Sequence, residues 1–476
     1  MKNKLSYLIG VACFLSYTGV FTSCVNGVDD EYLEQKFTDN GGTDDGKEGE
    51  ELPDLNGEYS IEGDYELEMT CNGEKLDGKK MTMSVDENNE MASITFAAAQ
   101  TDLETPIANA LPGGIGGLVS GWGLKYTGNS PVPGIKEITV TNVPLYRNGT
   151  DYLFEGSYVQ PTYTMNYKGK IEGEKAAIDI NYELTNQTLA GTWMTATDAG
   201  PSGDNTTVCS PLWIDWDSKV GVSLGKVSIV TINEKPMNGI FALLSGPLSK
   251  MIMGQLGINE KLEVIVRNLL ESVTAEPNGG MFASYSYGTD MTKPGPYSSE
   301  MPHNVLRYYF DPEAPDNRVF MEINGSFLID LIASLGTVAT STSTTSTTRT
   351  TPTTRDLRDP AKELIALLVP VLEKGIPCDY TLNDGKLTIN IDGVLLRNVL
   401  AKLMEIVNAP EAAGIVDGLL VGLGDFTSNI KLLLATLPAA LKYHDATTYD
   451  ENHIPTDPTG ECGYVKLGLK FVKAAN

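Results

Sequence analysis

The chain has 476 residues and a formal net charge of −27, from 62 acidic and 35 basic side chains. This length exceeds what one hydrophobic core usually fills, and the hydrophobic content of 41% excludes a wholly disordered chain. The acidic excess repels phosphate backbones, so we expect no nucleic acid as a partner.

Residues 1–24 have the pattern of a bacterial lipoprotein signal peptide. Lys2 and Lys4 precede an uncharged apolar stretch over 5–21, and small residues then lead to Cys24. The apolar stretch is at the lower limit for a membrane span, and the small residues favour cleavage. The ending Phe-Thr-Ser-Cys resembles a lipobox, whose cysteine carries the lipid, so we expect attachment at Cys24. The alternatives are an ordinary signal peptide that is cut elsewhere and a short membrane anchor.

Residues 25–54 form an acidic segment with 11 acidic and 2 basic side chains. Like charges repel and glycines add no stiffness, so this segment is expected to be an extended, flexible tether. The run Asp29-Asp30-Glu31 resembles the acidic surface-export signal of Bacteroidetes lipoproteins. The opening of the chain therefore resembles surface lipoproteins of domain-of-unknown-function families, some of which have lipocalin-like or BPI-like bodies. That resemblance implies a lipid-anchored protein of the outer membrane or cell surface, and it transfers no catalytic residue.

Residues 55–188 are expected to form a β-rich domain. Apolar residues alternate with polar ones as in half-buried strands, and turn pairs interrupt them. The pairs Asn72-Gly73, Asp77-Gly78 and Asn148-Gly149 are typical of tight hairpins, because these residue types adopt positive φ easily. The stretch 105–121 has helical spacing diluted by glycine and predicts one short helical insert.

Residues 189–336 predict an α+β domain. The segment Leu189–Trp193 echoes Leu55–Tyr59, and both resemble the Gly-x-Trp/Tyr start of a lipocalin-like sheet. Amphipathic patterns predict helices over 239–256 and 259–273, and strands return near 281–287 and 306–310.

A possible internal repeat joins this region to the last one. Residues 318–335 align without gaps to residues 386–403 with five identities, and each copy predicts a strand, a turn and a helix preceded by another strand. True duplication and convergent patterning are both compatible with so few identities. Between the copies, 337–356 is a Ser/Thr-rich linker in which 13 of the 15 residues 340–354 are Ser or Thr. Residues 357–476 are then expected to be an α+β region packing with 189–336, which makes the predicted fold class α+β.

The sequence carries no recognisable catalytic or metal motif. It has no phosphate-binding loop and no nucleophile elbow, and its three histidines are too scattered for a zinc signature. We therefore expect no cofactor and no metal. Cys71, Cys209, Cys378 and Cys462 remain after processing, and they allow three disulfide pairings or buried free thiols.

Four residues are weak candidates for ligand binding. Trp213 and Trp216, in a segment with two aspartates, could present aromatic faces to a sugar, or could be buried anchors. Leu244 and Met251 lie on the broad apolar face of the predicted helix 239–256, which could line a pocket or fill a core. We expect a non-enzymatic envelope protein that binds an apolar or glycan ligand. The alternative is a surface hydrolase acting on glycans or peptides through unrecognised acidic residues.

Overall fold

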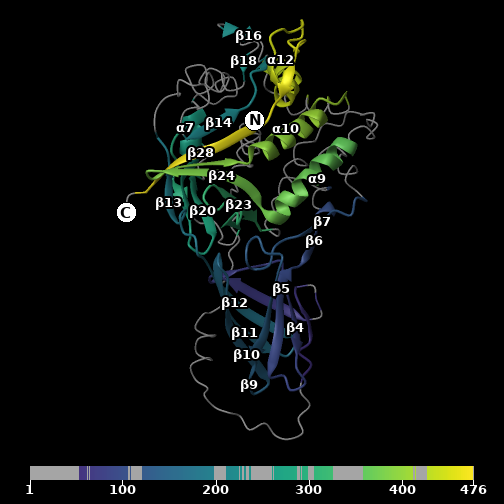
Figure 1. The fold of residues 1–476 in the computed structure, drawn as a ribbon, viewed down its shortest axis with the longest axis vertical. Coiled ribbons are helices and arrows are strands. Elements are labelled where there is room, and N and C mark those ends of the chain that lie inside the picture. The colour runs from purple at the N-terminus through teal and green to yellow at the C-terminus, as the bar shows by residue number, and fades with distance from the viewer. Residues whose placement is uncertain are drawn as a thin grey trace.

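The computed structural model describes residues 53–105 without 62 and 64, 121–197, 211–223, 262–286, 305–324, 358–410 and 426–474. It also describes short pieces within 106–120, 224–261, 287–304 and 411–425. Over these residues the protein is rich in strands, most of which form a sandwich and a closed barrel. Figure 1 shows the sandwich at one end of the long axis, with the barrel and the larger helices beyond it.

The sandwich is built from a four-stranded and a six-stranded sheet whose buried faces share one core. The first sheet has the order β1 (Gly57–Tyr59), β4 (Lys79–Val85), β5 (Met91–Ala98) and β8 (Glu137–Pro144). The second has the order β3 (Glu74–Lys75), β2 (Glu66–Cys71), β12 (Lys175–Leu184), β11 (Tyr163–Glu172), β10 (Asp151–Val159) and β9 (Tyr146–Asn148). A separate pair, β6 (Gln100–Asp102) and β7 (Lys125–Thr127), lies nearby.

Alternation along the strands explains the sandwich core. On β4, Met81 and Met83 are buried while the residues after each of them are exposed, as a strand with one face on a core requires. Glycine leaves room where large aromatic rings cross. A Cβ at Gly169 would lie 2.2 Å from the ring of Phe154 on the neighbouring strand, so that ring covers the glycine backbone.

The barrel has eight antiparallel strands in chain order. They are β13 (Gly191–Thr195), β19 (Leu270–Ala275), β20 (Gly280–Ser286), β22 (Leu306–Phe310), β23 (Arg318–Ile323), β24 (Ile376–Asn383), β25 (Lys386–Ile391) and β28 (Val465–Lys473). β28 pairs back onto β13, with Trp193 opposite Lys473, which closes the barrel. Two further strands, β14 (Leu212–Trp216) and β21 (Tyr297–Ser298), extend the sheet from β28 and β20. This is an up-and-down arrangement, which removes the sheet edges.

Neighbouring strands of the barrel differ in how many residue pairs they share. β24 and β25 share six residue pairs, whereas β20 and β22 share two, Gly280 with Arg307 and Met281 with Leu306. The junction of β20 and β22, which we call the seam, is the shortest strand pairing in the barrel as described. One more backbone hydrogen bond crosses next to the seam, from the Tyr308 N–H to the Gly279 carbonyl oxygen at 2.7 Å.

The larger helices lie outside the barrel strands. They are α7 (Leu262–Leu269), α9 (Arg358–Lys374), α10 (Gly393–Val407) and α12 (Phe426–Lys442). α7 contacts β19 and β20, α9 contacts β23 and β24, α10 contacts β25 and β28, and α12 packs on α10. α10, α12 and β14 enclose a second apolar cluster that includes Trp216, Leu396, Met404, Leu441 and Val465. Short strand pairs complete this part: β15 (Gly221–Val222) with β18 (Lys235–Pro236), β16 (Lys226–Val227) with β17 (Val230–Thr231), and β26 (Tyr443–Asp445) with β27 (Thr459–Glu461). Within the described part of the chain, the helices are too short or too polar to span a membrane.

Two of the three predicted hairpins are confirmed. Asn72 and Gly149 have positive φ in the turns of the hairpins β2–β3 and β9–β10. The prediction at Asp77-Gly78 is wrong: this turn connects β3 to β4, which lie in different sheets and do not pair with each other. The two proposed repeat copies supply β23 and β25, each paired with the strand before it, and α10 follows β25 as expected. The helix expected in the first copy, over 326–335, lies outside the described residues.

The regions 189–336 and 357–476 contribute strands to the same barrel. Five barrel strands come from the first region and three from the second, and β23 pairs with β24 across the boundary. The two regions therefore share one sheet and one core. The linker 337–356 between them lies outside the described residues.

The helix predicted over 259–273 is shorter than expected. α7 ends at Leu269 and the chain continues directly as strand β19 from Leu270. The apolar spacing of this stretch is compatible with a helix or a strand. Residues after 269 form a strand because they pair with β13 and β20.

Candidate functional site

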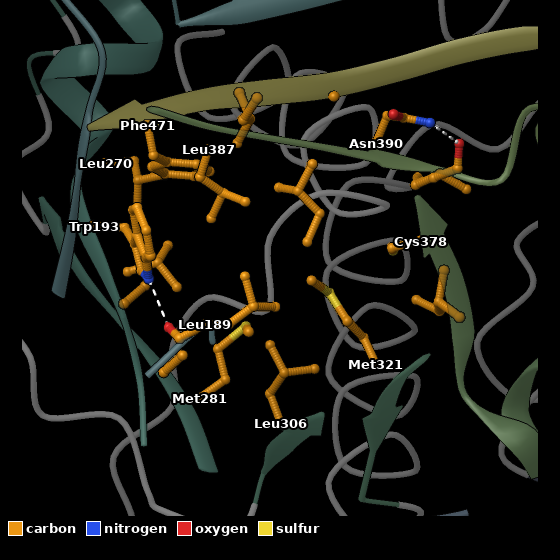
Figure 2. A pocket seen from close by; sticks show the side chains of 18 of the residues that line it. Leu189, Trp193, Leu270, Met281, Leu306, Met321, Cys378, Leu387, Asn390 and Phe471 are labelled. Carbon is orange, nitrogen blue, oxygen red and sulfur yellow. Dashed lines mark hydrogen bonds between the residues drawn. The ribbon is translucent and has the colours of Figure 1, made fainter. Parts of the chain in front are cut away.

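The barrel encloses an apolar cavity of about 150 Å³ (Figure 2). All eight barrel strands contribute to its lining. The lining residues are Leu189, Trp193, Leu270, Val273, Ala275, Met281, Phe282, Ala283, Leu306, Met321, Ile323, Ile376, Cys378, Leu387, Ile389, Asn390, Ile391, Leu467, Gly468, Leu469 and Phe471. The cavity is therefore a property of the closed barrel and not of one domain boundary or loop.

Trp193 seals one end of this cavity together with Leu189, Leu270, Leu387 and Phe471 (Figure 2). Its side chain is 2% exposed, and the indole Nε1 donates a 2.7 Å hydrogen bond to the carbonyl oxygen of Leu189. Gly191 between them has a φ of +127°, a conformation that favours glycine. The chain thus turns sharply before β13 and places the indole across the barrel interior.

The same arrangement begins the sandwich. Tyr59 is fully buried, and its hydroxyl donates a 3.2 Å hydrogen bond to the carbonyl oxygen of Leu55, four residues earlier. Gly57 has a φ of +150°, and a Cβ there would lie 2.6 Å from the ring of Tyr65. The five-residue echo in the sequence therefore corresponds to one local structure that is used twice.

The rest of the lining follows strand alternation. Inward residues such as Leu387 and Ile389 on β25, and Leu469 and Phe471 on β28, face the cavity. On the wall formed by β22, β23 and β24 the lining side chains are half-buried; they are Leu306, Met321, Ile323 and Ile376. The cavity therefore has a buried end near Trp193, and half-buried side chains line it on several strands away from that end.

The lining offers a ligand almost no polar partner. No lining residue in the described part of the chain carries a charged side chain. The two nitrogen-bearing side chains are already engaged, Trp193 with Leu189 and the Asn390 amide with the carbonyl oxygen of Ile391 at 3.0 Å. Burial raises the pKa of the Cys378 thiol to about 12, so it is neutral. A charged group that entered the cavity would lose its hydration without compensation.

The structure places the sequence candidates away from this cavity or outside its description. Trp216 is buried in the second apolar cluster, where its indole donates to the carbonyl oxygen of Ala440 at 3.3 Å. Trp213 lies beside it in sequence on β14, half-buried and opposite Gly468. Leu244, Met251 and Cys24 lie outside the described residues. The candidates therefore do not come together as one site among the residues that are described.

The cysteines in the described residues are Cys71, Cys378 and Cys462, and all three are buried. Cys378 and Cys462 are free thiols, and Cys209 lies outside the description. Burial raises the pKa of each of the three, which keeps the thiols protonated and unreactive. Across the described ranges no group of three His, Cys, Asp or Glu side chains is arranged to hold a metal ion.

Part of the cavity lining could be predicted from the sequence. The alternation Val465, Leu467, Leu469 and Phe471 marks one apolar face of a strand, and the last three residues line the cavity. What the sequence did not indicate is that eight such faces close around one space. Closure depends on the pairing of β28 with β13, and these two strands are far apart in the chain.

Comparisons with known proteins identify no relative: no family model matches the chain, and no significant match is found among curated proteins or solved structures.

Proposed function

We propose that this protein is a non-enzymatic binding protein whose barrel holds an uncharged apolar ligand. The observation that carries the proposal is the apolar cavity inside the closed barrel, in which the nitrogen-bearing side chains are already hydrogen-bonded. Ligand sites are typically apolar hollows with few polar groups, and the mouths and interiors of small barrels are common places for them. An apolar ligand fits this lining better than a glycan does, because a sugar needs several hydrogen-bond partners.

The cavity volume limits the ligand. An engineered protein cavity of about 150 Å³ lined by Leu, Ile and Phe stays dry and binds benzene or xenon. The present cavity has a similar volume and similar lining, so the buried part of the ligand is expected to be about the size of one benzene ring. Met281 and Met321 have flexible thioether side chains that adapt to irregular shapes, so the site tolerates related ligands.

A hydrolase acting through two acids is less well supported. Such an enzyme needs two carboxyl groups about 5–9.5 Å apart facing one cleft. The cavity lining contains no carboxylate, and a second groove outside the barrel contains one among its described residues, Glu271. That carboxylate accepts a 2.7 Å hydrogen bond from Ser284. These observations favour binding over hydrolysis.

The envelope location is part of the same proposal and rests on the sequence. The lipobox-like end at Cys24 and the acidic segment 25–54 support a lipid-anchored protein of the outer membrane or cell surface, similar to Bacteroidetes lipoproteins. The strand order of the barrel is compatible with the lipocalin-like body that this resemblance suggested. The α+β class for the region after residue 189 also belongs to the proposal, supported by the helices beside the barrel.

Fluorobenzene is a suitable probe, since it is uncharged, has the size of benzene and reports by ¹⁹F NMR. We expect saturable binding by the wild-type protein and no binding of fluorobenzoate, whose carboxylate would be buried without a partner. Ala283→Phe should abolish fluorobenzene binding, because Ala283 lines the cavity and the new ring would fill it. Thr388→Phe is the control, on β25 between the inward Leu387 and Ile389. Equal binding by wild type and Ala283→Phe would refute a site inside the barrel.

A further inference from the structure

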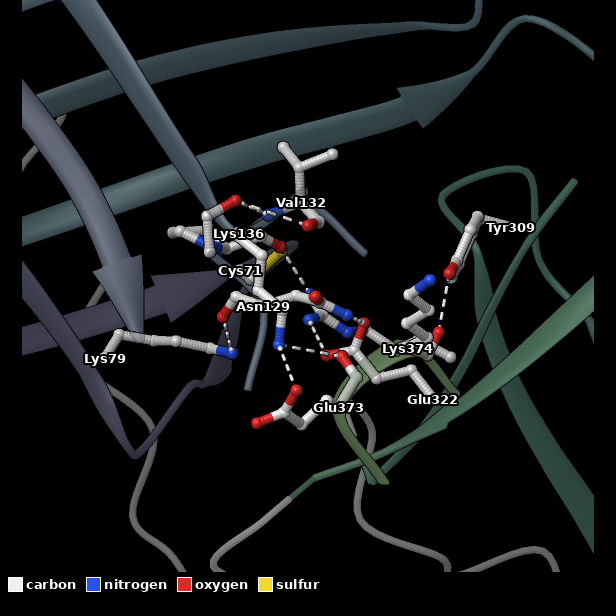
Figure 3. Close-up of polar contacts among 12 residues, drawn as sticks. Cys71, Lys79, Asn129, Val132, Lys136, Tyr309, Glu322, Glu373 and Lys374 are labelled. Atoms are coloured by element: carbon white, nitrogen blue, oxygen red, sulfur yellow. Dashed lines mark hydrogen bonds and ion pairs between the residues drawn. The ribbon is translucent and has the colours of Figure 1, made fainter. Parts of the chain in front are cut away.

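A segment of the sandwich is fastened to the outside of the barrel (Figure 3). We call residues 128–136, between β7 and β8, the strap. The Arg307 guanidinium on β22 donates a 2.5 Å hydrogen bond to the carbonyl oxygen of Pro131 in the strap. The Asn129 amide donates at 2.8 Å to Glu322 on β23, and the Lys79 ammonium on β4 donates at 2.8 Å to the Asn129 carbonyl oxygen. The strap therefore connects the sandwich to two adjacent barrel strands.

These contacts are buried and charged. Arg307 and Glu322 are each 3% exposed and form an ion pair at 3.1 Å, directly opposite each other in the β22–β23 register. Burial by itself would raise the pKa of Glu322, but Arg307 and Lys79 hold it below its ordinary value, so the carboxylate is ionised. Buried charges of this kind are stable only while their partners stay in place. The cluster therefore holds the strap and the two strands in one arrangement.

The strap also reaches the end of α9. Lys136 donates to the carbonyl oxygen of Glu373 at 3.2 Å, and the Tyr309 hydroxyl donates at 2.5 Å to that of Lys374. A Cβ at Gly134 would lie 2.5 Å from the Tyr309 ring, so the strap backbone lies directly on this side chain. β24 begins at Ile376, just after this junction. The strap thus supports β22, β23 and the start of β24 from outside.

The opposite faces of these strands line the cavity. Side chains alternate along a strand, so Arg307 points outward while Leu306 points inward, and Glu322 points outward between Met321 and Ile323. Leu306, Met321 and Ile323 on this wall are half-buried, as are lining residues of several other barrel strands. The seam, where β22 meets β20 through only two residue pairs, borders the same wall, and Arg307 is in one of those pairs.

We infer that the strap controls exchange of the ligand through the seam, an inference that rests on the proposed function of the cavity. The cavity is partly open, and parting of two neighbouring strands would widen the way in. β20 and β22 share the fewest residue pairs among the described barrel strands, with one further backbone bond from the Tyr308 N–H to the Gly279 carbonyl oxygen at 2.7 Å. The strap holds β22 against the barrel from outside through Arg307. Loosening the strap lowers the barrier to parting at the seam, and the ligand enters and leaves faster.

The test compares exchange rates of fluorobenzene by ¹⁹F NMR in two strap variants and two matched controls. Asn129→Ala removes the amide that contacts Glu322, and Asn181→Ala removes an amide-to-carboxylate contact to Asp179 at the exposed surface of the sandwich. Lys136→Met removes the contact to α9, and Lys175→Met removes the exposed ion pair with Glu66. Asn129→Ala should speed exchange about tenfold, a barrier about 1.4 kcal/mol lower. Lys136→Met should give a smaller increase, and both controls should exchange at the wild-type rate.

Amide hydrogen exchange without ligand provides a second measurement. Backbone amides of β22 should exchange faster in Asn129→Ala than in the wild type, whereas those of β24 and β25 should be unchanged. Fluorobenzene binding with equal exchange rates in strap variants and controls, and unchanged β22 amides, would overturn the strap inference while leaving the binding site intact. Absence of fluorobenzene binding in the wild type would overturn the proposed function and this inference with it.

Discussion

Two aromatic side chains, Tyr59 and Trp193, show what can be learned at the scale of single residues. Each lies in a strand two residues after a glycine with positive φ, and each donates a hydrogen bond to the leucine carbonyl oxygen four residues earlier. The similarity of the two five-residue segments predicted this likeness, because the glycine, the aromatic residue and the leucine all lie within five residues of one another. It did not indicate that Trp193 seals a ligand cavity, because that depends on strands more than 250 residues away.

Trp193→Phe tests the local hydrogen bond. The substitution removes the bond to Leu189 and leaves a buried carbonyl oxygen without its donor, so the free energy of unfolding should fall by about 1–3 kcal/mol. Tyr59→Phe is the matched variant in the sandwich and should cost less, since its bond to the carbonyl oxygen four residues earlier is longer, 3.2 Å. Urea unfolding measures both. Wild-type stability in either variant would contradict a structural role for that bond.

Lys79 gives a prediction about pH. Burial lowers its pKa to about 8, although Glu322 nearby opposes the shift, whereas the unfolded chain has the ordinary value of 10.5. Between pH 8 and 10.5 the unfolded state binds more protons at this residue than the folded state, so this residue makes stability rise with pH in that window. The stability difference between wild type and Lys79→Met should therefore shift in favour of the wild type by about 1–3 kcal/mol from pH 7.5 to 10.

Urea unfolding across this pH range measures that difference. Subtraction removes the contribution of groups that the two proteins share, including Arg307, Cys71 and Lys136 around Lys79. A difference that stays constant from pH 7.5 to 10 would mean that Lys79 titrates normally in the folded protein.

At the scale of elements, the sequence predicted most strands and helices with small errors. Turn pairs such as Asp384-Gly385 locate hairpins because few residues adopt positive φ, and both of these do. Apolar periodicity predicts helices over 361–374, 395–407 and 429–442, and α9, α10 and α12 begin two or three residues earlier and end where predicted. The error at α7 arises because an apolar periodic stretch suits a helix or a strand, and only its neighbours in the barrel decide.

Asp392 tests the junction between β25 and α10. Its carboxylate accepts from the backbone N–H of Leu395 at 2.8 Å as the N-cap, and it also pairs with Arg318 at 2.6 Å. Asp392→Ala should lower the free energy of unfolding by about 1–2 kcal/mol through loss of the cap alone. Asp392→Asn should cost less, because asparagine keeps the capping oxygen and loses the charge beside Arg318. Equal losses in the two variants, measured by urea unfolding, would show that the cap contributes nothing.

At the scale of the whole molecule, barrel closure could not be predicted from the sequence. The pairing of β13 with β28 joins residues separated by almost the whole second half of the chain, and no local pattern encodes it. The apolar faces of the strands were visible, but such faces equally suit an open sheet covered by helices. The sequence candidates Leu244 and Met251 came from a strong helical pattern, and Trp213 and Trp216 from an aromatic cluster. The cavity instead uses ordinary inward residues of many strands.

Cys24→Ala tests the proposed location. Loss of the lipidated cysteine should move the protein from the membrane fraction to the soluble fraction, because no other anchor is expected from the sequence. Fractionation with immunoblotting measures the share of the protein in each fraction, and the wild-type protein is the control. Membrane association that persists at the wild-type level would contradict a lipid anchor at Cys24.

The most direct test of a ligand in the barrel is native mass spectrometry of the protein purified from its own envelope. We predict that the wild-type chain carries one uncharged apolar molecule, identified after denaturation and extraction, and that Ala283→Phe purified in parallel carries none. A charged or strongly polar molecule bound to the wild type, or the same molecule retained by Ala283→Phe, would contradict an apolar ligand site inside the barrel.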